Sequence, residues 1–218
     1  RQALAIAREI GSKSEEGSNL GNLGNILQIQ GHFEQAIEHY RQAITIARET
    51  GNRRNEGSLL GNLGDAFFAR GQLGEAEAAL REAIAICDEV LPPAAGAFRG
   101  SLAILLAQRG ERDEALSLIE TGEPLVEAYR EEHAKFLCKK GTVCHIAGDA
   151  QGARTAMMRA RALAMELTVT GESELGQAMT RLSTLLEEHV RSGSNATEGA
   201  AAKTAAGQGS EIARELAL

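Results

Sequence analysis

A six-residue stretch that returns almost unchanged forty positions later is the feature that most limits how this chain can fold. Residues 20–25 read Leu-Gly-Asn-Leu-Gly-Asn, and residues 60–65 read Leu-Gly-Asn-Leu-Gly-Asp. The likeness continues on both sides of the motif. A fixed period of this size is typical of an array of stacked repeats, in which each unit packs only on its neighbours.

Hydrophobic spacing predicts two helices in each period. Apolar residues recur every three or four positions in four segments, which we expect to be helices: 16–30, 33–50, 56–70 and 73–90. Each of the first three is followed by a glycine, Gly31, Gly51 or Gly71, suited to the left-handed position just past a helix end. Residues 1–10 show the same pattern before Gly11, as the second helix of a truncated repeat. Aromatic residues make up only 3% of the chain, which favours an all-α fold over a sheet.

The small and large residues of both periods resemble the tetratricopeptide repeat. In the first copy the matching residues are Leu20, Leu23, Gly24, Leu27, Gly31, Phe33, Ala36, Tyr40 and Ala43; in the second they are Leu60, Leu63, Gly64, Phe67, Gly71, Leu73, Ala76, Leu80 and Ala83. The usual first-helix Trp of that family is Leu here, and its terminal Pro is replaced by a continuing helix. With the forty-residue period, this is similar to the long variant of kinesin light chains, Leu-Gly-Asn-repeat polarity adaptors and bacterial regulators. The resemblance implies an all-α, right-handed α-solenoid of helical hairpins.

The expected organisation is an array over residues 1–190 followed by a tail. After the truncated repeat 1–11 we expect repeats at 17–50, 57–90, 96–129 and 134–167, and a closing helix at 172–190. Leu91-Pro92-Pro93 is expected to be a linker, and Gly122 with Pro124 predicts a kink or break. Residues 191–209 have the composition of a Gly/Ala-rich linker, and 210–218 form a short amphipathic segment. That segment is predicted to dock on the array or on a neighbouring molecule.

Glycine inside a helix costs about 1 kcal/mol relative to alanine, so Gly24 and Gly64 need a structural reason. We expect them to face Ala36 and Ala76, so that two small residues bring the helix axes together.

Candidate binding residues lie on the side of each first helix opposite its partner. In the tetratricopeptide family this side lines a concave groove that holds extended peptides, which implies a set of groove positions here: Asn22, Asn25, Gln28, Asn62, Asp65 and Phe68. Asn suits the task because its side chain both donates to and accepts from a peptide backbone. The alternative is that these are solvated polar positions. The fourth repeat adds Lys135, Lys139 and His145, either a cationic patch for a carboxylate or an ordinary exposed lysine face.

Other sites and partner classes are not supported by the residues. Cys138, Cys144 and His145 lack the paired short spacings of a structural zinc site, so no metal and no cofactor are predicted. No catalytic constellation is recognisable, which predicts a protein that is not an enzyme. The net charge of −7 disfavours nucleic acid, and no apolar run reaches membrane-spanning length. Three cysteines form no paired framework, which favours a reducing, cytoplasmic location.

The sequence therefore predicts a protein-interaction scaffold that binds a peptide or helix segment of unknown identity, in which the occupant is a protein partner, the chain's own C-terminal tail or a neighbouring copy. The rival hypothesis is a regulatory or sensory module of a larger signalling protein, a kinase or transcription regulator, whose effector domain lies outside this sequence.

Overall fold

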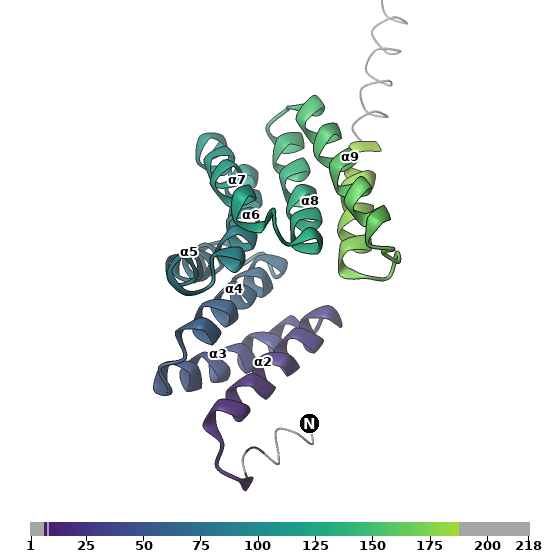
Figure 1. The fold of residues 1–218 in the computed structure, drawn as a ribbon. Helices are drawn as coiled ribbons and strands as arrows, with labels where there is room; N and C mark the ends of the chain where they lie inside the picture. Colours follow the sequence, from purple (N-terminus) through teal and green to yellow (C-terminus); the bar gives the residue numbers. More distant parts are fainter. Residues whose placement is uncertain (1–6, 8, 188–218) are drawn as a thin grey trace, which may run out of the picture.

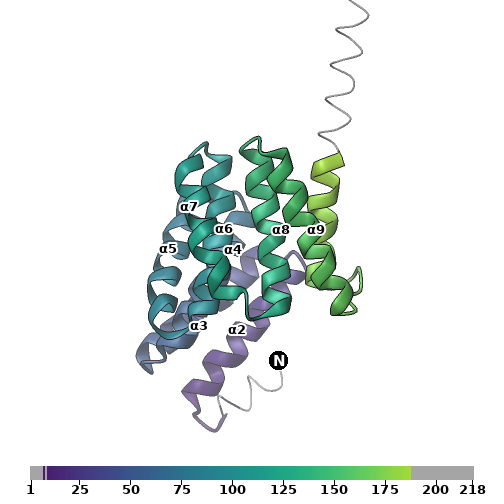
Figure 2. The same cartoon turned by 45° about the horizontal axis from the view of Figure 1, so that its top comes forward.

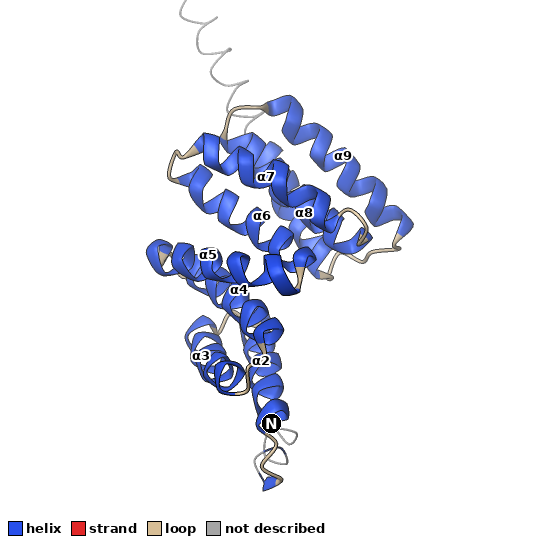
Figure 3. Cartoon of the chain, turned by 60° about the vertical axis from the view of Figure 1, so that its left-hand side comes forward, coloured by secondary structure: helices blue, strands red, loops and turns tan. Residues whose placement is uncertain are grey.

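The computed structural model describes residue 7 and residues 9–187, and it is built from helices joined by tight turns (Figure 3). The helices with their bounds are α2 (Lys13–Ile29), α3 (Phe33–Glu49), α4 (Arg53–Ala69), α5 (Leu73–Val90), α6 (Pro92–Gln108), α7 (Arg112–Val126), α8 (Arg130–Ile146) and α9 (Ala150–Glu166). A further helical segment covers 174–187 and is called the closing helix below. The predicted all-α solenoid is confirmed.

Glycine sets the turns between successive helices. Six glycines just past helix ends have positive φ, between 67° and 88°, which L-residues with a side chain rarely adopt: Gly11, Gly31, Gly51, Gly71, Gly110 and Gly148. Each lets the chain reverse within about three residues, so that consecutive helices pack antiparallel as hairpins. The hairpins follow one another along a curve (Figure 1), with α2 and α3 at one end and α9 with the closing helix at the other.

The junction between the second and third hairpins differs from the sequence expectation. Pro92 and Pro93 form the first turn of α6, and Leu91 alone separates that helix from α5. Proline is well tolerated at this position because its missing N–H would have no helical partner there. The predicted linker is therefore wrong.

The predicted break in α7 is also absent. The helix continues through Pro124 to Val126. Pro124 lies in the last turn, where the loss of one donor removes a single backbone hydrogen bond. Gly122 is buried, and a Cβ atom at this position would lie 2.9 Å from Phe136 Cε2, so the packing leaves no room for a side chain.

The helices enclose two hydrophobic clusters. The larger is continuous from Leu20 to Val143 and joins α2 through α8, whereas the smaller joins α8, α9 and the closing helix and includes Leu137, Met157 and Leu182. In Figure 2 helices α6 to α9 lie side by side over the first two hairpins.

Within the hairpins, the helical glycines make room for large side chains rather than for alanine. A Cβ atom on Gly24 would lie 2.6 Å from Tyr40 Cε1, and one on Gly64 would lie 2.7 Å from Leu80 Cγ. The expected facing of Gly24 by Ala36 and of Gly64 by Ala76 is therefore wrong. The side chains that pack on these glycines are Tyr40 and Leu80, each one helical turn after the expected alanine.

The predicted tail, 191–209 and 210–218, lies outside the described residues, as do the last three residues of the predicted closing helix. The domain boundaries drawn from the sequence stay predictions.

Candidate functional site

The first helices of the four hairpins, α2, α4, α6 and α8, carry polar residues at equivalent positions. In Figure 1, α3, α5 and α7 lie on the outer side of the curve, and α2, α4 and α8 line its inner side. Counting back from the positive-φ glycine that ends each hairpin turn gives the register. The residues nine positions earlier are Asn22, Asn62, Ser101 and Lys139, and those six positions earlier are Asn25, Asp65, Ile104 and Thr142.

A hydrogen bond joins the first two of these helices. Asn62 Nδ2 donates to Asn25 Oδ1 at 3.0 Å. The Tyr40 hydroxyl from α3 lies 2.8 Å from Asn25 Oδ1 and 2.8 Å from Gln28 Oε1, and it donates its proton to one of them at a time. Burial, with a smaller contribution from the charge of Asp65, raises the pKa of Tyr40, so this hydroxyl stays a donor. Three of the predicted groove residues therefore belong to one network.

A related set of polar contacts joins the next three first helices. Lys139 Nζ donates to Ser101 Oγ at 2.8 Å and to the carbonyl oxygen of Ala97 at 3.0 Å, and the Ser101 hydroxyl is placed to favour the ionised carboxyl of Asp65. Burial of the carboxyl raises the pKa of Asp65 above its ordinary value, although the charge of Lys139 and the Ser101 hydrogen bond act in the opposite direction. The chain of contacts Lys139–Ser101–Asp65 thus crosses α8, α6 and α4.

These two sets of bonds form what we call the polar ladder: Asn25–Asn62, then Asp65–Ser101–Lys139. In both steps the residue nine before the turn glycine interacts with the residue six before it in the preceding repeat, through a hydrogen bond in the first step and an electrostatic influence in the second. The polar positions predicted to face a partner therefore also hold successive repeats in register.

The lysines of the fourth repeat are already paired. Lys135 Nζ lies 2.8 Å from Glu174 Oε2, 3.0 Å from Glu132 Oε1 and 3.1 Å from Glu131 Oε1. Burial would lower the pKa of Lys135, but hydrogen bonds to these three carboxylates outweigh it and raise the pKa. His145 lies half-buried further along α8. Acidic side chains thus pair with Lys135, whereas Lys139 is held by hydrogen bonds to two neutral oxygens.

Helix α2, the first helix of the first complete hairpin, presents an open stripe. Asn22 is exposed and makes no hydrogen bond within the described part of the chain, and Ile26 and Ile29 beside it are 53% and 83% exposed. The positions equivalent to Ile26 in the later hairpins are fully buried, each at 0% exposure: Ala66, Leu105 and Val143. The stripe of Asn22, Ile26 and Ile29 combines one amide group with apolar surface, and it lies on the face of α2 whose equivalent in α4 carries Asn62, bonded to the preceding repeat, and the buried Ala66.

Sequence reasoning missed the part played by Tyr40, which it assigned to packing alone. The signal was a correlated difference between the two copies. Tyr40 occurs with Gln28, whereas Leu80 at the same position in the second copy occurs with Phe68, which is half-buried against the core. A polar residue on the first helix is kept where the second helix supplies a hydroxyl.

The described residues hold neither a metal-binding cluster nor a membrane-spanning helix. No group of three or more His, Cys, Asp or Glu side chains there is arranged to hold a metal ion. None of the helices in the same part of the chain has the length and apolar character needed to cross a membrane.

Comparisons with known proteins agree with the helical register. Residues 1–49 and 15–89 match one tetratricopeptide repeat family profile, and residues 96–121 match a second. The search of curated proteins found no match.

Solved structures with this fold are similar at low sequence identity. The BtubC (BKLC) protein of P. vanneervenii is 15% identical with a TM-score of 0.65, and the alignment covers 89% of each chain. The putative kinesin light chain repeats of Podospora anserina are 20% identical with a TM-score of 0.54, covering 80% of this chain and 93% of that one. A Rap protein complexed with Competence and Sporulation Factor is 17% identical with a TM-score of 0.59, covering 86% of this chain and 58% of that one.

Repeat period, hairpin geometry, turn glycines and family matches agree along the array. This chain is a tetratricopeptide repeat protein.

Proposed function

We propose that this array is a non-catalytic protein-interaction scaffold that binds a peptide or helix segment along its inner helices, chiefly over α2 and α4. The observation that carries the proposal is the open stripe of Asn22, Ile26 and Ile29 beside the polar ladder. The Asn22 amide makes no hydrogen bond within the described part of the chain, and the two isoleucines offer exposed apolar surface. Such a surface suits an extended segment with apolar side chains.

The neighbouring ladder supplies rigidity as well as contacts. Asn25 Oδ1 is occupied by Asn62 and Tyr40, but the Asn25 amide nitrogen projects from an exposed residue and remains a donor. Because both helices are locked by this bond, a bound segment loses its own conformational entropy while the receptor loses little. Gln28, Asp65 and Phe68 border the same surface.

The fourth repeat has a smaller part in this proposal. Lys135 and Lys139 already have partners, so they contribute only if an incoming carboxylate replaces Glu174 or the Asp65–Ser101 contact. His145 lies further along α8. We therefore place partner recognition in the N-terminal half.

A second candidate function is a regulatory module of a larger signalling protein. The likeness to a Rap protein complexed with a factor supports it, since that structure joins a similar array to a bound partner. Both candidates require partner binding, and they differ in whether binding changes the activity of another domain. The free, buried cysteines Cys87, Cys138 and Cys144 are compatible with the predicted cytoplasmic location, which stays a prediction.

The experiment is selection from a random peptide library displayed on phage, followed by affinity measurement on variants. Asn22→Ala combined with Ile29→Ala removes the open stripe, and Gln35→Ala on the exposed outer surface of α3 is the matched control. We expect selected peptides to bind wild type and the Gln35 variant alike and to lose at least tenfold in affinity for the double variant. Equal binding to all three proteins at unchanged melting temperature would show that the site is elsewhere.

A further inference from the structure

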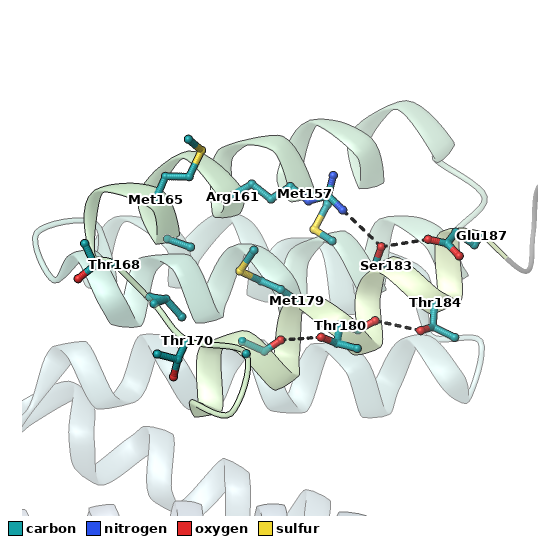
Figure 4. A pocket seen from close by; sticks show the side chains of 14 residues that line it. Met157, Arg161, Met165, Thr168, Thr170, Met179, Thr180, Ser183, Thr184 and Glu187 are labelled. Carbon is teal, nitrogen blue, oxygen red and sulfur yellow. Dashed lines mark hydrogen bonds between the residues drawn. The ribbon is translucent and has the colours of Figure 1, made fainter.

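A groove of about 630 Å³ lies between α9 and the closing helix (Figure 4), and none of the residues that line it belongs to the open stripe or to the polar ladder. Three of the chain's four methionines line it: Met157, Met165 and Met179. Met165 is 81% exposed, which is unusual for so large an apolar side chain. On the other side of the groove the closing helix contributes Thr180, Ser183 and Thr184.

This groove occupies the position of a second helix in the repeat. The closing helix opens with Leu175-Gly176, which corresponds to the Leu-Gly at 20–21 and 60–61, and Met179 then stands where Gly24 and Gly64 stand. Those glycines receive Tyr40 and Leu80 from the second helix of their own hairpin. Within the described residues no second helix follows the closing helix, so its equivalent face and Met179 border the groove instead.

We propose that the C-terminal segment 210–218 of the same chain docks in this methionine-lined groove. The chain leaves the described part of the structure at Glu187, which itself lines the groove. The segment reads Ser-Glu-Ile-Ala-Arg-Glu-Leu-Ala-Leu. Ile212 and Leu216 are four residues apart, so a helix here presents both on one face. Methionine adapts its shape to such a guest better than a branched side chain does.

The intervening sequence has the length needed for this return. The closing helix spans 14 described residues, 174–187, or about 21 Å at 1.5 Å per residue, and the segment must reach back along it. Residues 188–209 number 22 and include the predicted Gly/Ala-rich linker, and a linker of that length would have an r.m.s. span of about 26 Å at 5–6 Å per square root of residue number. Because span and distance match, the effective local concentration is of millimolar order. Docking within one chain therefore outcompetes docking between copies at micromolar protein.

The methionines themselves supply the test, because the fourth one, Met158, is 71% exposed and does not line the groove. The probe is the full chain labelled with ¹³C in its methionine methyl groups, each NMR signal being assigned by a single Met→Leu variant. The test variant is Ile212→Asp with Leu216→Asp, and the matched control is Glu211→Gln with Glu215→Gln. We expect the test variant to shift the Met165 and Met179 signals and to leave Met158 in place, and the control to shift none.

Two outcomes would overturn the proposal. Identical Met165 and Met179 signals in wild type and the Asp variant would mean that the segment does not occupy the groove. A wild-type signal position that changes with protein concentration would mean that a second copy, and not the same chain, fills it. A far-UV circular dichroism spectrum of the Asp variant equal to that of wild type confirms that the array is intact. Peptide binding at the open stripe is unaffected in either case, so this test is independent of the proposed function.

Discussion

Asn62 and Asn25 share a hydrogen bond of 3.0 Å that ties the first helix of one repeat to the first helix of the next. Both residues belong to the motif that recurs forty positions apart. One repeat later, Ser101 and Asp65 occupy the same two positions, with a hydroxyl and a carboxyl in place of the two amides, and the Ser101 hydroxyl favours the ionised form of that carboxyl. The recurring polar residues thus stabilise the stacking of the array and line its inner surface at once.

A double-mutant cycle separates these two roles. Asn25→Ala and Asn62→Ala are expected to couple by about 0.5–1.5 kcal/mol in the free energy of unfolding, the net value of one hydrogen bond. Asn22→Ala with Asn62→Ala is the matched pair without a shared bond, and its coupling should be close to zero. Urea unfolding followed by circular dichroism measures both cycles. Equal coupling in the two cycles would remove the stacking role from the Asn25–Asn62 bond.

Gly61→Ala should destabilise the junction between the second and third hairpins. A Cβ atom at this position would lie 2.0 Å from Phe98 Cζ, and 2.2 and 2.3 Å from the two Cε atoms, so the ring must move out of a buried site. We expect a loss of about 1–3 kcal/mol from overpacking, which exceeds the roughly 1 kcal/mol that alanine gains over glycine inside a helix.

Gly74→Ala is the control for that substitution. Gly74 is exposed in α5, and no atom lies within 4 Å of an added Cβ. Here the better helix propensity of alanine acts alone, so stability should rise by up to about 1 kcal/mol. Thermal melting of the two variants should therefore move in opposite directions, and a higher melting temperature for Gly61→Ala would contradict the packing seen at Phe98.

The buried thiols should be unreactive while the array is folded. Burial raises the pKa of Cys87 and of Cys138 to about 11, and it also raises the pKa of Cys144. The reactive thiolate is therefore scarce at neutral pH, and access is blocked as well. Iodoacetamide labelling read by mass spectrometry should modify all three only when denaturant is added. Rapid native labelling of any one of them would show that its helix opens locally.

Sequence periodicity was enough to predict the hairpins, because residues that share a helix face recur every three or four positions and glycine marks the turns. It was not enough to predict which neighbour each residue meets. Gly24 was assigned to Ala36 and instead accepts Tyr40, since the stagger between two packed helices is set by side-chain size and is not encoded in the spacing.

The ion pairs of Lys135 also divide into contacts that the sequence predicts and a contact that only the fold creates. The contacts of Lys135 with Glu131 and Glu132 follow from helical spacing of four and three, but its shortest contact is with Glu174 in the closing helix. Only the fold brings those two helices together. The polar ladder has the same origin: its positions were found from the repeat, and its bonds required the geometry between repeats.

Asp65 gives the sharpest pH-dependent prediction. Burial raises its pKa in the folded array, so the folded state holds this proton more tightly than the unfolded chain does. The stability that this contributes is complete below the unfolded pKa of about 3.9 and is lost as the pH rises through the higher folded value.

The Asp65→Asn variant cannot ionise, so its stability does not fall in this way. The difference in unfolding free energy, variant minus wild type, should therefore increase from pH 4 to pH 7 in urea titrations. Comparing the two proteins cancels the opposite trend from Glu56, Glu77 and Glu123, whose pKa values are lowered by their basic partners despite burial. A difference that decreases over this range would mean that Lys139 stabilises an ionised Asp65 and that the ladder contains an ion pair.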